Sequence, residues 1–107
     1  MTFLETKYLN LAREIILKSV PKDKYAVFLF GSRANGKSKK TSDIDIGIYW
    51  ETPFPRIKKI IMEEELEESN IPYYVDIIDF NDVSEEFKKV ALQWIVVWSN
   101  PKNFAIK

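Results

Sequence analysis

The sequence predicts an α/β domain in which helices and strands alternate along the chain. Apolar residues recur at helical spacing over residues 2–19, which favours a helix. Residues 25–30 are continuously apolar, as in a strand buried on both faces, and residues 43–48 alternate acidic or small side chains with isoleucine. A length of 107 residues suits one domain with a single core, so we expect residues 1–107 to form one unit.

The expected elements follow one another without an internal repeat or a low-complexity linker. They are a helix over 2–19, a strand over 25–30, a short helical turn within 33–42, a strand over 43–50, a helix over 56–69, a strand over 73–79, a helix from about 84 to 92 and a strand over 95–98. Pro21, and later Pro53 and Pro55, interrupt the chain because proline cannot continue a helix or an inner strand. The connection between the first two strands is short for a parallel crossover, so we expect these strands to pair antiparallel.

Two of the later helices carry apolar residues that we expect to face the core. In the helix over 56–69 the expected inward residues are Ile57, Ile60, Ile61 and Leu66, and in the last helix they are Phe87, Val90 and Ala91. The first of these helices also carries five glutamates between positions 63 and 68. We interpret them as a solvated face, with a docking face for a basic partner as the weaker alternative.

The composition excludes several functional classes. Lysine and arginine number 16, as do aspartate and glutamate, so we expect no strong binding of nucleic acid. Cysteine and histidine are both absent, which excludes thiolate and imidazole metal sites and leaves carboxylates as the metal ligands. No apolar run reaches about 18 residues and no signal peptide is visible, so we expect a cytoplasmic protein that does not bind membranes.

The pair Asp43 and Asp45 carries the strongest chemical signal. Alternate residues of a strand share a face, so these two carboxylates lie about 7 Å apart while Ile44 and Ile46 point into the core. Neighbouring carboxylates repel each other unless a cation lies between them, and Mg²⁺ is commonly held by one or two carboxylates together with substrate phosphates. We expect Gly47, on the same face, to leave open space beside the acids. Taken alone, an Asp-x-Asp is more often a strand start with two solvated acids.

A glycine–serine step lies between the first apolar strand and these acids. Gly31 allows a sharp turn and the close approach of a ligand to the backbone. We expect Ser32 to be the N-cap of the next turn, where free N–H groups bind phosphate, although an ordinary strand-to-helix turn explains the pattern too. Arg33 is the nearest cation and suits forked phosphate bonding. Phosphate contact and a solvated loop explain three further cations equally well: Lys37, Lys39 and Lys40.

A third acidic candidate lies on the strand over 73–79. Asp76 stands between Val75 and Ile77, in the middle of an apolar run, where a charge is costly unless it is paired or bound to a metal. Asp79 lies at the end of the same strand, beside residues typical of a turn. We therefore interpret Asp76 as functional and Asp79 as structural.

The composite pattern resembles a known family signature. Gly31-Ser32, a spacer of ten residues and Asp43-Ile44-Asp45 together resemble the motif of the DNA polymerase β-like nucleotidyltransferase superfamily. The surrounding residues look like its small prokaryotic branch, the minimal nucleotidyltransferases (MNT), which are called MntA-type antitoxins when they pair with a HEPN-domain toxin. The resemblance covers residues from about 25 to 98. One departure is Asn35, where many relatives carry arginine.

This resemblance implies a fold and an activity. The implied fold is a polymerase β-like core, a mixed sheet with helices packed mainly on one face. The implied activity is transfer of a nucleoside monophosphate, AMP from ATP, to a hydroxyl group. Asp43, Asp45 and Asp76 would be the catalytic residues and the ligands of two Mg²⁺ ions, in line with their residue types.

The resemblance also implies the nucleotide contacts and a partner. Gly31, Ser32 and Arg33 would bind the phosphates of the nucleotide, and the acceptor would be a tyrosine of a HEPN toxin. The alternative hypotheses are a non-catalytic antitoxin that binds nucleotide or toxin, and a nucleotidyltransferase for small molecules of the aminoglycoside type. The sequence leaves open which nucleotide is used, how many are transferred and whether the chain forms a homodimer.

Overall fold

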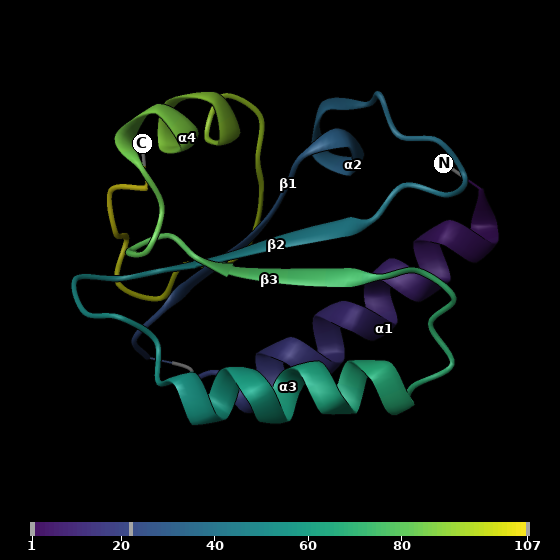
Figure 1. Ribbon diagram of the computed structural model, residues 1–107, viewed down its shortest axis with the longest axis horizontal. Helices are drawn as coiled ribbons and strands as arrows, with labels where there is room; N and C mark the ends of the chain where they lie inside the picture. The colour runs from purple at the N-terminus through teal and green to yellow at the C-terminus, as the bar shows by residue number, and fades with distance from the viewer. Residues whose placement is uncertain (1, 22, 107) are drawn as a thin grey trace.

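The computed structural model describes residues 2–21 and 23–106, and the elements follow the predicted order (Figure 1). The helices and strands are α1 (Phe3–Ser19), β1 (Ala26–Phe30), α2 (Ser32–Asn35), β2 (Ile44–Tyr49), α3 (Arg56–Glu68), β3 (Val75–Asp79), α4 (Glu85–Ala91) and β4 (Val96–Ser99). Side chains cap the starts of two helices. The Thr2 hydroxyl accepts a hydrogen bond from the N–H of Glu5, and the Ser84 hydroxyl accepts one from the N–H of Phe87.

The strands form one mixed sheet in the order β3-β2-β1-β4. β1 pairs antiparallel with both β2 and β4, which confirms the predicted antiparallel connection, whereas β2 and β3 are parallel. The parallel pair is joined through α3, which supplies the long crossover that such a pair needs. Every residue of β1 is buried, as the continuous apolar run predicted.

The two faces of the sheet are covered unequally. The long helices α1 and α3 lie together on one face, below the sheet in Figure 1, while α2 and α4 lie above opposite ends of the other face. The core on the first face includes Leu9, Ala12 and Ile16 of α1, Ile44, Ile46 and Ile48 of β2, and Met62 and Leu66 of α3. The core on the second face is smaller and largely aromatic: Ala26, Phe28, Phe30, Phe80, Leu92 and Ile106. This arrangement confirms the predicted mixed sheet with its long helices on one face, and it leaves the end of the second face beside α2 without a long helix over it.

The predicted inward faces of two helices are confirmed only in part. In α3, Leu66 is buried as predicted, whereas Ile57, Ile60 and Ile61 are exposed and Met62 is the other buried residue. α3 packs mainly against α1 and the edge strand β3, so a single i, i+4 stripe meets the core and its three isoleucines face solvent.

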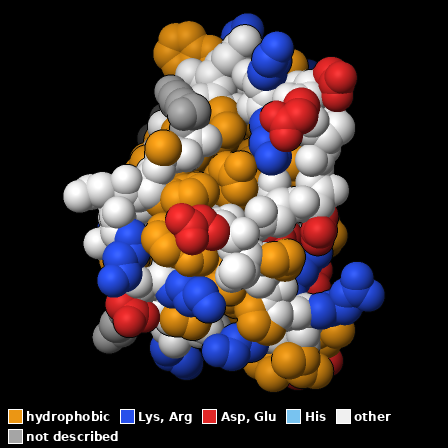
Figure 2. All heavy atoms as spheres, turned by 90° about the vertical axis from the view of Figure 1, so that its left-hand side faces the viewer, with side chains coloured by type: hydrophobic (Ala, Val, Ile, Leu, Met, Phe, Trp, Pro, Cys, Tyr) orange, Lys and Arg blue, Asp and Glu red, His pale blue; other side chains and the backbone are white. Residues whose placement is uncertain are grey.

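In the short helix α4 no residue is fully buried, and Val90 is exposed. The other two predicted residues do face the core: Ala91 packs against the second core, and the ring centre of Phe87 lies 6.1 Å from that of Phe30 and 5.8 Å from that of Phe80. Leu92, immediately after the helix, is buried in the same core. Figure 2 views the end of the molecule that lies on the left of Figure 1, where apolar side chains form a patch with charges of both signs around it. Among the helices of the described chain, none combines the length and the hydropathy that a bilayer crossing would need.

Candidate active site

The parallel pairing of β2 and β3 brings two of the predicted acids side by side. Asp45 and Asp76 are direct partners in the register, so their side chains lie on the same face of the sheet. Their strand neighbours Ile46 and Ile77 are buried on the opposite face, against α1 and α3. Asp43 stands one residue before β2 and two before Asp45. The three acids therefore gather on the face of the sheet that no long helix covers, near the start of β2.

The three carboxylates form a negatively charged site in which no lysine or arginine of the described residues pairs with them. Burial raises the pKa of Asp45 above its ordinary value of 3.8, and the negative charges of Asp76 and Asp43 raise it further. Ion pairs in the described part of the chain join Lys18 to Glu65, Arg33 to Glu5 and Lys88 to Glu85, and none includes these three acids. A bound cation would relieve the repulsion.

The donor set fits a magnesium ion that shares its ligands with a substrate. Within residues 2–21 and 23–106, no group of three or more acidic side chains converges closely enough to form a complete protein cage for a metal. Mg²⁺ usually keeps water and substrate phosphate oxygens among its ligands and takes only one or two carboxylates from the protein. The adjacent carboxylates of Asp45 and Asp76, with Asp43 beside them, match this incomplete type of site.

Gly31 makes room for one of these carboxylates. Its backbone has φ +73° and ψ −158°, a conformation that side chains strongly disfavour. A Cβ atom at this position would overlap the carboxylate oxygen of Asp45. The group found close to the Gly31 backbone is the carboxylate of Asp45, and the approach of a ligand to this glycine stays a prediction.

Ser32 takes a different position in α2 from the one predicted. Gly31 is the N-cap and Ser32 is the first helical residue, without a capping hydrogen bond from its side chain. The reason is that the backbone changes direction at the positive φ of Gly31, so the helix begins one residue earlier than a serine cap would require. The Ser32 side chain is thus not committed to the helix end, and it stands directly after the turn that contacts Asp45.

Arg33 has partners other than those that the sequence suggested. Its side chain is fully buried, and its Nε and Nη2 atoms donate to the carbonyl oxygen of Ser42 at 3.1 and 2.7 Å. Its Nη1 lies 3.4 Å from Oε2 of Glu5, and the guanidinium lies 4.4 Å from the ring centre of Tyr73. All three guanidinium nitrogens are therefore engaged inside the protein, and this arrangement does not support direct phosphate contact. Lys37, Lys39 and Lys40 are exposed on the loop that follows.

The expectation for Gly47 is wrong. This glycine is buried, and a Cβ atom there would overlap the ring of Phe28 and lie 2.8 Å from the ring of Phe80. The missing side chain makes room for Phe28 and Phe80, whose rings pack edge to face with their centres 4.9 Å apart.

Asp79 has the structural role that its position predicted. Its buried carboxylate accepts hydrogen bonds from the N–H groups of Phe54, at 2.8 Å, and Asn81, at 2.9 Å. It therefore joins the loop before α3 to the turn after β3. Two acids on one strand thus have different environments, since Asp76 faces the anionic site and Asp79 is satisfied by the backbone.

Sequence reasoning missed Tyr74, which lies at the rim of the site. The N–H of Ile44 donates to the carbonyl of Tyr74, which extends the parallel ladder by one residue and places Tyr74 opposite Asp43. The residue is 63% exposed, and the charge of Asp76 is the main cause that raises the pKa of its hydroxyl. The available signal was its position two residues before Asp76, which gives both side chains the same direction in a strand.

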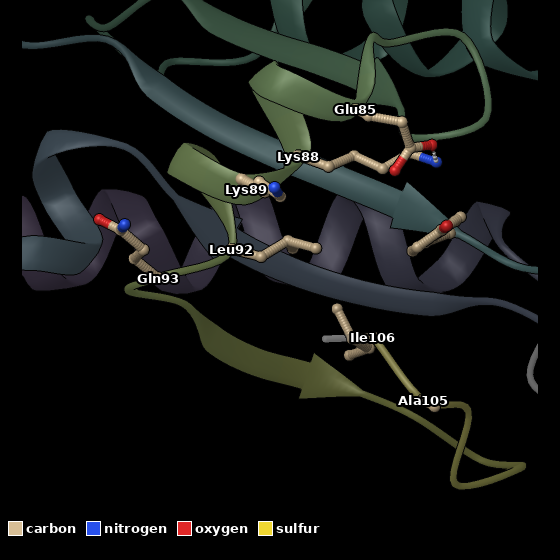
Figure 3. A pocket seen from close by; sticks show the side chains of 8 residues that line it. Glu85, Lys88, Lys89, Leu92, Gln93, Ala105 and Ile106 are labelled. Carbon is tan, nitrogen blue, oxygen red and sulfur yellow. Dashed lines mark hydrogen bonds and ion pairs between the residues drawn. The ribbon is translucent and has the colours of Figure 1, made fainter.

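A separate groove lies far from the acids along β2. It has a volume of about 430 Å³, and Figure 3 shows it between α4 and the segment that ends at Ile106. Tyr49, the last residue of β2, lines it, whereas Asp45 lies near the start of that strand. The groove is therefore not part of the carboxylate site.

Comparison with known proteins agrees with this geometry. Residues 8–103 match the family model described as polymerase beta nucleotidyltransferase. The chain is 34% identical over 94 residues to a Haemophilus influenzae protein named "Probable protein adenylyltransferase MntA", a match that covers 88% of this chain and 81% of that protein.

Two solved structures share the fold. One is a toxin–antitoxin crystal structure with AMP-PNP, with a TM-score of 0.68 and 22% identity, covering 87% of this chain and 73% of that chain. The other is the complex of a tri-AMPylated Shewanella oneidensis HEPN toxin with its MNT antitoxin, with a TM-score of 0.57, 22% identity and coverage of 83% and 70%. At this identity the two structures support the fold alone. The family match and the Haemophilus relative confirm the resemblance seen in the sequence: the chain belongs to the polymerase β nucleotidyltransferase family, as an MNT-type nucleotidyltransferase.

Proposed function

We propose that this chain transfers AMP from ATP to a hydroxyl group of a partner protein, with Mg²⁺ bound at the three acids. The observation that carries the proposal is the pairing of Asp45 with Asp76 on an open face of the sheet, next to Asp43 and the Gly31 turn. An uncompensated group of carboxylates suits a metal-bound polyphosphate. We also treat the chain as one minimal domain, because both apolar cores pack on the same sheet.

The residues divide the chemical work between them. Asp43, Asp45 and Asp76 would hold Mg²⁺, which supplies charge stabilisation for the phosphates and lowers the pKa of the attacking hydroxyl. The Gly31 backbone and the Ser32 hydroxyl would bind the β- and γ-phosphates. The acceptor oxygen forms a bond to the α-phosphorus, the bond from that phosphorus to pyrophosphate breaks, and Asp76 accepts the proton of the hydroxyl. Catalysis of this kind depends on positioning and electrostatics, which require neither histidine nor cysteine.

The acceptor is inferred from the relatives. The Haemophilus relative is named as a protein adenylyltransferase, and a structural neighbour comes from a complex in which a HEPN toxin is AMPylated. We therefore infer that the acceptor is a tyrosine of a HEPN toxin and that this chain acts as its antitoxin.

A labelling experiment tests this function. The purified chain is incubated with its partner toxin, Mg²⁺ and ATP labelled at the α-phosphate, and label on the toxin is measured. Asp43→Asn with Asp45→Asn should abolish labelling while the far-UV circular dichroism spectrum stays unchanged. Asp82→Asn, which alters an exposed acid outside the site, is the matched control and should label normally. Full labelling by the double variant would refute the assignment, and neutralisation of the toxin without any label would indicate occlusion in place of catalysis.

A further inference from the structure

We propose that Arg33 is a positioning residue, which holds the backbone on either side of the acidic site and does not bind the nucleotide. The proposal rests on the function proposed above, because it concerns the placement of Asp43 and Asp76. Three negative charges close together repel one another, so the segments that carry them must be restrained from outside the site. Arg33 contacts both of the segments that lead into the acidic strands.

The first contact restrains Asp43. Ser42 directly precedes Asp43, so its carbonyl belongs to the peptide unit that contains the Asp43 nitrogen. Two N–H groups of Arg33 donate to this one oxygen, at 3.1 and 2.7 Å, which restricts both the position and the direction of the peptide plane. Ser42 also closes a turn with Lys39, through a backbone hydrogen bond of 3.1 Å and a bond from the Lys39 N–H to the Ser42 hydroxyl of 2.8 Å. Asp43 is thus held although it lies outside β2.

The second contact reaches the strand that carries Asp76. The guanidinium of Arg33 lies 4.4 Å from the ring centre of Tyr73, three residues before Asp76. One side chain therefore connects the loop before β2 with the segment before β3. A change in its position would move both segments, and with them the distance between the acids.

The third contact anchors Arg33 itself. Its charge is paired with the carboxylate of Glu5 in α1 at 3.4 Å, and the side chains are 0% and 10% exposed. If Arg33 turned outward to bind a phosphate, it would leave Glu5 as a buried, unpaired charge and the Ser42 carbonyl without its donors, both of which are costly. Arg33 therefore stays buried, and it acts on the acidic site by holding the peptide group of Ser42 in place.

Arg33→Lys is the decisive variant, because lysine keeps the charge and loses the planar fork that holds the Ser42 carbonyl. We expect kcat for toxin labelling to fall about 10- to 100-fold, the magnitude seen when a catalytic group shifts by about 1 Å, with KM for ATP nearly unchanged. We expect half-maximal activity to need more Mg²⁺, whereas calorimetry at saturating Mg²⁺ should show binding of AMP-PNP close to that of the wild type. Amide hydrogen exchange over residues 39–44 should become faster in the variant, with or without ligand.

Two control variants separate positioning from general destabilisation. Arg13→Lys also removes an arginine that donates to a main-chain carbonyl, that of Trp98 on β4, but it lies outside the acidic site. Ile16→Val weakens the core under the sheet without touching Arg33. Both should keep the wild-type Mg²⁺ requirement and the wild-type exchange over residues 39–44.

The outcomes distinguish this proposal from the proposed function. A raised KM for ATP with unchanged kcat and unchanged exchange would show that Arg33 is a phosphate ligand, and would overturn the proposal. Loss of stability alone, as in Ile16→Val, would also overturn it. If the wild-type chain neither labels the toxin nor binds AMP-PNP, the proposed function fails, whereas faster exchange over residues 39–44 in Arg33→Lys still supports Arg33 as the residue that holds this segment.

Discussion

The carboxylate of Asp45 lies where the side chain of residue 31 would be, so Asp45 has its observed position only because residue 31 is glycine. The two residues are far apart in the motif, yet the antiparallel register pairs Asp45 with Phe30, directly before Gly31. The glycine of the motif and its second aspartate therefore form one structural unit at the end of β1.

Gly31→Ala should remove activity as well as stability. The positive φ of +73° disfavours any side chain by about 1–2 kcal/mol, and the added methyl group would also displace the Asp45 carboxylate. Gly36→Ala is a closely matched control, because Gly36 also has a positive φ of +80° but open space around its Cβ position. Urea unfolding should show destabilisation in both variants, and toxin labelling should be lost only in the first. Normal labelling by Gly31→Ala would contradict the conclusion that Asp45 needs a glycine at position 31 to hold its place in the site.

Asp45→Asn should stabilise the protein at neutral pH when Mg²⁺ is absent. Burial and the charges of Asp76 and Asp43 raise the pKa of Asp45 in the folded chain, so the folded state binds the proton more tightly than the unfolded state. Stability from this group is therefore present below its ordinary pKa of 3.8 and is lost as the pH rises through the raised value.

The asparagine variant avoids this loss. It should gain up to about 1 kcal/mol at pH 7, since solvent screens part of the repulsion, and the gain should shrink toward pH 3. Urea unfolding across this pH range measures the difference, with Asp82→Asn as the control that should not change. A gain that is independent of pH would show that the charge of Asp45 is not its cause. Adding Mg²⁺ with AMP-PNP should stabilise the wild-type chain more than the variant.

Asp76→Asn and Asp79→Ala should have opposite effects, although the two residues lie on the same strand. Asp79 accepts two backbone hydrogen bonds in a buried position, so its removal should cost about 2–3 kcal/mol and leave the labelling rate of the folded protein close to normal. Asp76 has no such structural partners among the described residues and repels Asp45, so Asp76→Asn should keep or slightly raise stability and abolish labelling. Chemical unfolding and toxin labelling are measured on both variants. Lost labelling in Asp79→Ala at normal stability, or normal labelling in Asp76→Asn, would contradict these roles.

Gly47→Ala should destabilise the fold without acting on the site directly. Its methyl group would overlap the ring of Phe28 and press against Phe80, and overpacking of this kind typically costs about 1–3 kcal/mol. The melting temperature should fall, while the labelling rate per folded molecule at low temperature should stay near that of the wild type. A selective loss of labelling with a normal melting temperature would restore the earlier expectation that Gly47 borders the ligand space.

The sequence by itself determined the order of the elements, the antiparallel pairing of the first two strands and the shared direction of the Asp43 and Asp45 side chains. These features depend on local spacing: alternate residues of a strand share a face, and prolines and capping residues mark the helix boundaries. It also pointed to Asp76, since a charge in the middle of an apolar strand needs a partner. The structure brings the three acids to one end of the sheet, and their catalytic roles stay a prediction that the variants above test.

Only the tertiary structure decided the partners of Arg33, the contact of Gly31 with Asp45, the packing over Gly47 and the exposed isoleucines of α3. Each depends on which segment, distant in sequence, lies opposite, and a pattern of residue types carries no information about that neighbour. Arg33 is the clearest case, because a cation after a glycine turn suits a phosphate equally well until Glu5, Ser42 and Tyr73 are found around it. Periodicity specifies the direction of a side chain within its own element, whereas the arrangement of the elements in space specifies what that side chain meets.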